Sequence, residues 1–300
     1  MKMMERKPLD ASAVALMLGL CVFWGLQQVA VKLALPHMGA IMQIGLRSAI
    51  AALLVCVVIW WHGGGSLKAG TLRPGIIAGT LFAVEFICVA AGLEFTTASH
   101  MSVFLYTAPV FTVLGLHWLV PGERLGPVQW AGVLAAFAGI AVAFSGGFSA
   151  QGRDWMHMLI GDALGVMGGA FWGATTVWIR RSALSEAPPT ATLLYQLGVC
   201  GIVMTGVALA LGQGASVTMT GVVWASLFFQ SVIIAFLSFL LWFWMLRRYL
   251  ASRLTVFSFM TPLFGVGFGV LLLNDPIDAR FAAGAALVMT GVILVNIRRT

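Results

Sequence analysis

The sequence has 300 residues, of which 60% are hydrophobic and only 9% are charged, and its mean hydropathy is +0.99. Soluble globular domains carry about 25% charged residues, so this composition excludes a soluble protein and indicates one built into lipid. At about 20 residues for each membrane-spanning helix, the chain holds roughly ten spans and has no room for a separate water-soluble domain. The net charge of +7 does not indicate a nucleic-acid-binding protein, because the basic residues lie between the apolar segments and are not gathered on one surface.

Ten apolar segments follow in chain order, each bounded by charged residues, glycine, proline or a polar cluster. They lie at about 11–33, 41–61, 74–93, 97–119, 127–146, 157–179, 190–211, 221–246, 252–273 and 280–297. Each is a continuous apolar run, which favours helices over the alternating strands of a membrane β-barrel. The first run is long enough to span and is followed by nine more, so we interpret it as a helix and not as a cleaved signal peptide. The expected fold is an all-α polytopic membrane protein with ten transmembrane helices.

The distribution of Lys and Arg predicts the orientation of these spans. With the N-terminus inside, thirteen of the seventeen basic residues fall in segments that face the cytoplasm, three fall in outer segments, and Arg47 lies within a span. Positive charge resists translocation, so both termini are expected in the cytoplasm. The even number of spans agrees with this orientation.

The second half of the chain repeats features of the first in the same order. Phe23-Trp24-Gly25 recurs as Phe171-Trp172-Gly173, the segment Ser102 to Pro109 parallels Thr255 to Pro262, and Gly132 with Gly139 parallels Gly284 with Gly291, at offsets of 148, 153 and 152. The halves 1–150 and 151–300 each hold five spans, and an odd number means that the second copy enters the membrane from the opposite side. Two inverted repeats can open a central site alternately to each side, an arrangement that suits transport.

The sequence combines these two five-span halves, each with Phe-Trp-Gly near its start, with Arg47 in the second span and Pro109 and Pro262 in the fourth and ninth. In this combination it resembles the drug/metabolite transporter superfamily, and most closely its EamA-type exporters, over essentially the whole chain. The resemblance implies a bacterial-type carrier of the inner (plasma) membrane that moves small metabolites, often amino acids or drug-like compounds, outward. One position departs from the repeat: Gln196 stands where the second half would repeat Arg47.

Arg47 and Glu85 are the two ionisable residues that stand out inside the predicted spans, and they lie at similar depths. A charged side chain in a span costs a few kcal/mol, roughly, unless it faces a partner or water, so both are candidates for function. Three interpretations remain open. The two residues form an ion pair that fixes the packing of the second and third helices, or Glu85 exchanges a proton, or Arg47 holds a substrate carboxylate.

Other polar and aromatic residues near mid-membrane complete the predicted lining of a central cavity. Gln27 and Gln28 are adjacent on a helix, so at least one faces the interior, where either hydrogen bonding between helices or a polar substrate path explains it. Aromatic side chains, Trp242 among them, could form a wall for an apolar or aromatic ligand. The predicted lining consists of Trp24, Gln27, Gln28, Arg47, Glu85, Tyr106, Trp172, Thr176, Gln196 and Gln230.

Prolines and glycines indicate where helices bend or approach each other closely. Pro109 and Pro262 each remove a backbone donor at repeat-related depths and are candidate hinges, with a static kink as the alternative. Glycines recur every fourth residue along the sixth span, at Gly161, Gly165, Gly169 and Gly173, and predict a stripe for close helix packing. Such glycine-rich seams permit a homodimer without requiring one.

The sequence contains no motif for a metal or for a nucleotide cofactor. Its five histidines lack ligand spacing, its four cysteines lie singly in apolar runs, and no ATP-binding loop is present. We therefore expect no cofactor, no enzymatic activity and a secondary carrier of small organic solutes, driven by an ion gradient or the substrate gradient. Two alternatives stay open: an intramembrane enzyme with Glu85 as base and a lipid-linked substrate, and a scaffold or receptor that does not transport.

Overall fold

The computed structural model describes residues 10–61, 70–119, 125–147, 153–248 and 260–296, and the regular structure in them is entirely helical. The first half contains α1 (Ala11–Ala34), α2 (Ala40–Trp61), α3 (Leu72–Phe95), α4 (Ala98–Leu105), α5 (Ala108–Leu119) and α6 (Pro127–Gly147). The second contains α7 (Arg153–Arg181), the 3-10 helix η1 (Ala183–Glu186), α8 (Pro189–Ala210), the 3-10 helix η2 (Gln213–Ser216), α9 (Gly221–Phe228), the π-helix η3 (Phe229–Ser238), α10 (Phe239–Arg248), α12 (Thr261–Leu273) and α13 (Ala279–Asn296).

These helices confirm the prediction of an all-α polytopic membrane protein of about ten spans. Every predicted span coincides with one helix or with consecutive helices, although the ninth is described only from Met260 onward. Among the described residues, six helical segments are long and apolar enough to cross a membrane. Large apolar side chains are exposed around them, such as Ile202 at 78% and Leu271 at 76%, as expected for a surface that faces lipid chains.

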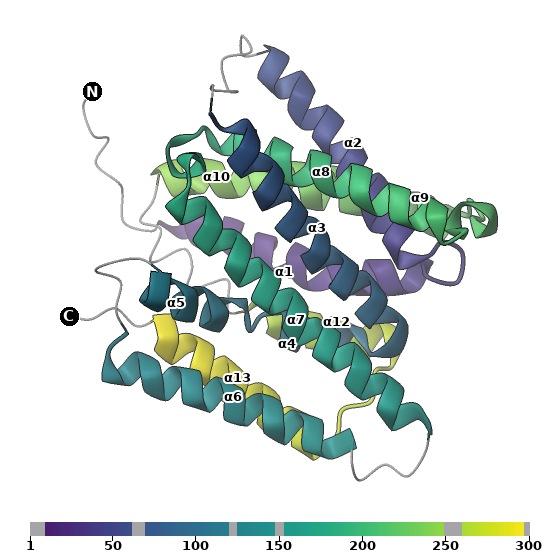
Figure 1. The fold of residues 1–300 in the computed structure, drawn as a ribbon. Helices are drawn as coiled ribbons and strands as arrows, with labels where there is room; N and C mark the ends of the chain where they lie inside the picture. The colour runs from purple at the N-terminus through teal and green to yellow at the C-terminus, as the bar shows by residue number, and fades with distance from the viewer. Residues whose placement is uncertain (1–9, 62–69, 120–124, 148–152, 249–259, 297–300) are drawn as a thin grey trace.

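The helices run between two ends of the molecule (Figure 1). α1 begins and α13 ends at the same end, which the Lys and Arg distribution assigns to the cytoplasm and which we call the inner end; the opposite end is the outer end. α1 runs from the inner to the outer end, and α7 runs back in the opposite direction. Helix pairing repeats between the halves: α1 packs along α12, and its counterpart α7 packs along α4 and α5.

Glycines set the closest helix contacts. On α6 and α13, a Cβ at Gly139 would lie 2.6 Å from the carbonyl oxygen of Gly284, and one at Gly132 would lie 2.8 Å from that of Gly291, so the glycines that match between the halves meet each other. The stripe on α7 also meets its neighbours directly: Gly161 faces Thr96, and the others in the stripe face α4, α5 and the residues between them. This confirms the predicted packing role of the stripe.

Two spans depart from a regular α-helix. The fourth is divided between α4 and α5 at Tyr106 and Thr107, just before Pro109, whose ring nitrogen has no hydrogen to donate to the preceding turn. The Thr107 hydroxyl donates to the carbonyl of Phe104 at 2.6 Å, which satisfies one group at the break. The eighth span contains ten residues of π-helix, η3, a rare geometry that is frequent at functional sites.

Candidate functional site

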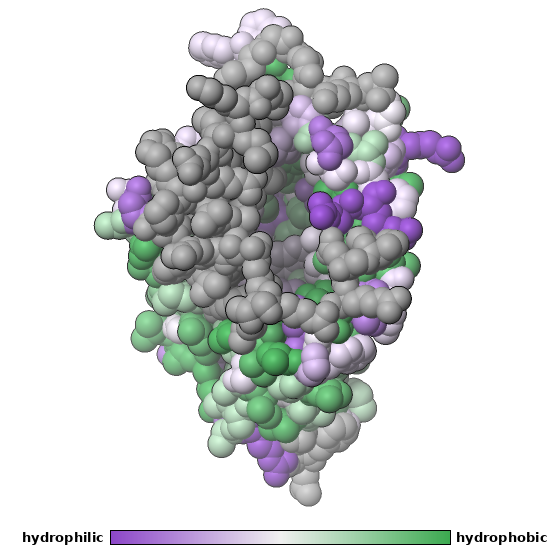
Figure 2. All heavy atoms as spheres, turned by 90° about the vertical axis from the view of Figure 1, so that its left-hand side faces the viewer, coloured by the Kyte–Doolittle hydropathy of each residue, from purple (hydrophilic) through white to green (hydrophobic). Residues whose placement is uncertain are grey.

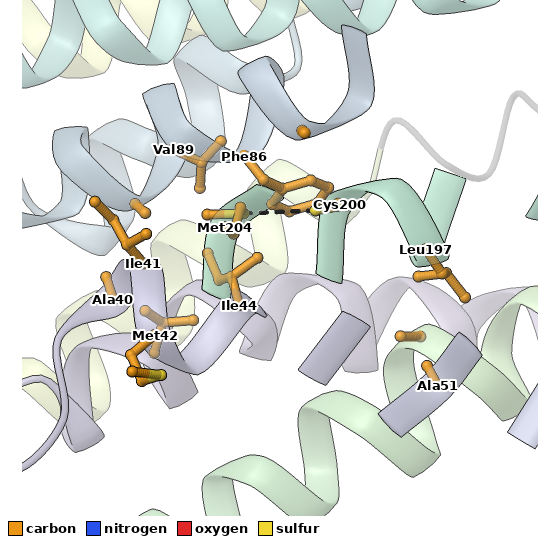
Figure 3. Close-up of a cluster of buried hydrophobic side chains, with 14 of the residues drawn as sticks. Ala40, Ile41, Met42, Ile44, Ala51, Phe86, Val89, Leu197, Cys200 and Met204 are labelled. Atoms are coloured by element: carbon orange, nitrogen blue, oxygen red, sulfur yellow. Dashed lines mark hydrogen bonds between the residues drawn. The ribbon is translucent and has the colours of Figure 1, made fainter. Parts of the chain in front are cut away.

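Arg47 is buried in the interior of the bundle, with 2% of its surface exposed. Its guanidinium carbon lies 4.3 Å from the centre of the Phe86 ring, a cation–π contact between α2 and α3. Phe86 in turn points toward Cys200 and Met204 of α8 (Figure 3). Arg47 Nε and Nη1 have no hydrogen-bond partner in the described part of the chain. A buried guanidinium with unpaired donors is a ready binding group for a planar anion.

Glu85 is buried next to Phe86 on α3, with 4% exposed. Arg47 and Glu85 are within electrostatic range of each other. Their charged atoms do not approach within 4 Å of each other, so they do not form an ion pair. Among the described residues, the one pair within that distance joins His100 and Asp162. Glu85 Oε2 also lacks a hydrogen-bond partner among these residues. The predicted neighbours therefore lie close together while both keep free hydrogen-bonding capacity.

Other buried polar atoms in the interior are similarly unpartnered in the described residues. Such atoms are rare in proteins and each needs an explanation, of which a bound polar ligand is one. Besides those of Arg47 and Glu85, they are Gln28 Oε1, Thr205 Oγ1, Gln230 Oε1, Ser231 Oγ and Thr261 Oγ1. They come from α1, α8, η3 and α12, so both halves of the chain contribute.

Gln230 belongs to a hydrogen-bond chain that the sequence did not reveal. Its Nε2 donates to Gln43 Oε1 at 3.1 Å and to Ser226 Oγ at 2.8 Å, and Ser226 donates to the carbonyl of Ala30 at 2.8 Å. Gln43 Nε2 donates to the carbonyls of Val31 and Met38. This chain ties the outer parts of α1 and α2 to α9 and η3. Gln43 was missed because an uncharged residue near the end of a span gives little signal.

The predicted aromatic residues form two edge-to-face pairs. Trp24 meets Trp242 with ring centres 5.8 Å apart, and its indole nitrogen donates to Ser238 Oγ at 2.9 Å. Tyr106 meets Trp172 at 5.4 Å. The Tyr106 hydroxyl lies near Thr261 at the start of α12. Trp24, Tyr106 and Trp172 are half-buried.

The remaining predicted residues have mixed surroundings. Gln27 and Gln196 are half-buried, and Thr176 is exposed, with its hydroxyl bonded to the Trp172 carbonyl at 3.0 Å. Pro109 follows the break between α4 and α5, and Pro262 lies in the first turn of α12, where a missing donor costs little. Their roles as hinges and as lining residues stay predictions.

Hydrogen bonds join the two halves at the outer end. The Thr218 amide donates to the His37 carbonyl at 2.9 Å, and the Met42 amide donates to Gln213 Oε1 at 3.2 Å. Further bonds join Ser99 to Asp275 and His100 to Asp162. The corresponding bonds near the inner end tie α3 to α7 and α8, and α6 to α13. Figure 2, which views the inner end, shows a hollow near its middle.

A separate apolar groove of about 560 Å³ lies between α3, α5, α6 and α7. Trp118, Trp178 and Arg181 contribute to its lining, and none of the ten predicted lining residues does. It is therefore distinct from the predicted lining.

The His100–Asp162 pair is the other polar feature that sequence reasoning missed. Asp162 and His100 are 1% and 5% exposed, and Oδ2 of the aspartate lies 2.8 Å from Nδ1 of the histidine. Both residues lie near predicted span ends, where charged groups are ordinarily solvated. Nothing in their spacing of 62 residues indicates that they meet.

Comparison with known proteins gives a consistent result. The profile of the EamA-like transporter family matches the chain twice, over residues 11–145 and 159–297. An uncharacterized transporter of Archaeoglobus fulgidus is 26% identical over 93% of this chain and 95% of its own length. A probable amino-acid metabolite efflux pump of Escherichia coli is 22% identical over 91% of both chains. A solved crystal structure, 18% identical, shares the fold with a TM-score of 0.62 and covers 96% of this chain and 98% of its own.

Proposed function

We propose that this chain, which belongs to the EamA-like transporter family, is a secondary carrier that exports small carboxylate-bearing metabolites by alternating access. The two halves, 1–150 and 151–300, act as inverted repeats around a shared central site. Both termini lie in the cytoplasm and the protein resides in the inner membrane. The unpaired guanidinium of Arg47 is the observation on which the substrate class depends.

The structure supports alternating access through its two unlike ends. Bonds join the halves at both ends, but Figure 2 shows a hollow near the middle of the inner end. The opposite directions of α1 and α7 agree with inverted repeats, which can exchange the open and closed ends by rocking. The arrangement thus corresponds to the state that receives substrate from the cytoplasm.

The surroundings of Arg47 support a carboxylate ligand. Its planar fork matches the two oxygens of a carboxylate, and the low polarity around Phe86 strengthens such a bond. Unpaired acceptors at Gln28 and Gln230 suit a substrate ammonium or amide group. Amino acids carry both kinds of group, in agreement with the name amino-acid metabolite efflux pump that two relatives bear.

Transport by purified protein in liposomes tests this proposal. Vesicles loaded with an unlabelled amino acid are expected to take up the labelled amino acid by exchange, and the amine that lacks its carboxylate should neither be taken up nor compete. The solute must emerge chemically unchanged, because a product would indicate an enzyme. A carrier that moves the amine as well as the amino acid would contradict carboxylate recognition.

Arg47→Lys provides the matched variant, because it keeps the charge and loses the planar fork. Hydrogen bonds to charged groups contribute about 1.5–3 kcal/mol, so we expect the KM for the amino acid to rise about tenfold or more. Arg73→Lys, at an exposed position near the inner end of α3, should leave KM unchanged. An unchanged KM in Arg47→Lys would remove Arg47 from the binding site.

A further inference from the structure

The His100–Asp162 pair joins the two halves at the outer end. His100 lies in the first turn of α4, in the first half, and Asp162 lies on α7, in the second. The histidine ring stacks flat on Phe281 of α13, with ring centres 3.8 Å apart and planes 4° from parallel. The second carboxylate oxygen of Asp162 accepts a hydrogen bond from the Thr96 hydroxyl. The C-terminal end of α3, the first turn of α4, α7 and α13 therefore meet at one buried imidazole and one buried carboxylate.

A second contact of the same kind lies one residue away. Asp275, from the segment between α12 and α13, accepts hydrogen bonds from both the amide and the hydroxyl of Ser99, at 2.9 and 2.8 Å. Two carboxylates of the second half thus hold the start of α4 in the first half. These contacts exist only while the outer ends of the halves lie together, so their strength acts directly on the closure of that end.

Other charged and titratable groups lie on the segments that meet at the outer end. Glu94 is exposed at the end of α3, and Lys32 of α1 lies within electrostatic range of Glu94 and Asp275. Asp278 bonds the Phe281 amide, Arg280 is exposed at the start of α13, and His157 of α7 lies beside Phe95. Among the described residues, Asp162 is the one charged group bonded to His100. The charge of the imidazole therefore acts mainly on the bond to Asp162.

We propose that His100, paired with Asp162, is a proton-binding site whose occupation closes the outer end of the carrier. Imidazole changes charge between about pH 5 and 8. With Nδ1–H donated to Asp162, the incoming proton is added at Nε2, and the resulting imidazolium–carboxylate bond is stronger than the neutral one. The added proton thus strengthens a contact between the two halves, and it thereby favours the state in which their outer ends lie together.

This site would make the return step of export depend on the pH of the outer solution, an inference that rests on the proposed alternating access. After substrate leaves to the outside, His100 is exposed to the outer solution and takes up a proton. The ion pair with Asp162 then forms, the outer end closes, and the empty site becomes accessible from the cytoplasm. When the outer end reopens, the pair separates and the proton returns to the outer solution. Protonation therefore favours the return step without crossing the membrane, and exchange of substrate for substrate does not require that step.

Distance measurements between the halves test the proton site without any substrate. Spin labels are placed at Leu33→Cys and Ile277→Cys, two exposed outer positions from different halves, after replacement of the four native cysteines. Lowering the pH from about 8 to 6 should increase the population with the shorter separation. In His100→Gln, whose amide can still donate to Asp162, this response should disappear. His157→Gln, an exposed histidine at the same end, should retain it.

Transport measurements provide the second readout. His100→Gln and Asp162→Asn should retain substrate exchange, whereas the increase in net efflux that the parent shows when the outer solution is acidified from about pH 8 to 6 should disappear. A parent protein whose label separation ignores pH, or a His100→Gln variant that responds like the parent, would overturn the proposal. If no variant transports any amino acid, the proposed substrate class fails, while the distance response still decides whether His100 is the proton site.

Discussion

At the scale of single residues, the interior of this protein is unusual in what it leaves unpaired. Arg47 and Glu85 are both buried and mutually attracted, yet neither satisfies the other at ion-pair distance. Two residues that form a permanent structural ion pair would be expected to lie within ion-pair distance, because a buried charge with only part of its hydrogen bonds made is costly. An arginine held on a phenylalanine ring, with a carboxylate nearby, is better suited to exchange one anion for another. In the proposed site, Glu85 competes with the substrate carboxylate for Arg47.

This competition predicts the effect of Glu85→Gln. Removing the negative charge should strengthen the attraction of Arg47 for a substrate carboxylate and lower KM several-fold, the opposite of the effect of Arg47→Lys. Initial exchange rates over a range of amino-acid concentrations measure the change. Glu94→Gln, exposed on the same helix, is the control.

The pH dependence of net efflux in Glu85→Gln separates the two candidate proton sites. Because His100 carries the proton in our proposal, this variant should keep the pH dependence of the parent. Loss of that dependence with normal exchange would instead support Glu85 as the residue that exchanges the proton. An unaltered KM would show that Glu85 does not compete with substrate.

Single residues could be predicted from the sequence when their side chains are costly to place in a bilayer. Charges within apolar runs, such as Arg47 and Glu85, stand out because the bilayer penalises them. Gln43, His100 and Asp162 did not, because their importance depends on which neighbour each helix face meets. Which helix faces meet is set by packing between the halves, and this cannot be read from a single sequence.

At the scale of helices, matched glycines set the contact between α6 and α13. Gly132 and Gly139 of one helix meet Gly291 and Gly284 of the other, so the two backbones touch without intervening side chains. Dispersion and packing provide most of the attraction between helices in lipid, and such close contact maximises both. The glycines that repeat between the two halves of the sequence thus lie on the two helices of one contact.

Gly139→Ala is therefore expected to destabilise the bundle. The added methyl group would lie 2.6 Å from both the Gly284 carbonyl oxygen and the Val288 amide nitrogen, and backbone atoms cannot move aside as a flexible side chain can. Overpacking of this kind costs about 1–3 kcal/mol. Thermal unfolding in detergent should show a Tm lowered by several degrees. Gly198→Ala on α8, where an added Cβ meets nothing within 4 Å, should unfold like the parent.

The helices themselves were largely predictable, and their irregularities only partly so. Pro109 indicates the interruption between α4 and α5, because proline removes a backbone donor. The π-helix η3 has no such signal, since Phe229–Ser238 contains neither proline nor glycine. The Ser238 hydroxyl bonds the carbonyl of Ile234 at 2.6 Å and accepts from Trp24, so η3 ends at a contact with the other half of the chain.

At the scale of the whole molecule, the sequence predicted duplication and orientation but not the conformational state. An odd number of spans in each half and the bias of Lys and Arg are properties of the chain alone. Which end is closed depends on small differences between two similar packings of the same helices. The contacts between the halves at the outer end, of which the bond from Thr218 to His37 is the most direct, come from the structure alone.

If the outer end must open in each cycle, fixing that contact should stop transport. Cysteines at His37 and Thr218, in a background without the native cysteines, place two thiols where the backbones already lie 2.9 Å apart between amide nitrogen and carbonyl oxygen. A short reducible cross-linker should abolish exchange in this double variant, and a reductant should restore it. Each single variant should be insensitive to the reagent. Full exchange by the cross-linked protein would show that substrate crosses without separation of the halves at the outer end, and the rocking mechanism would then be wrong.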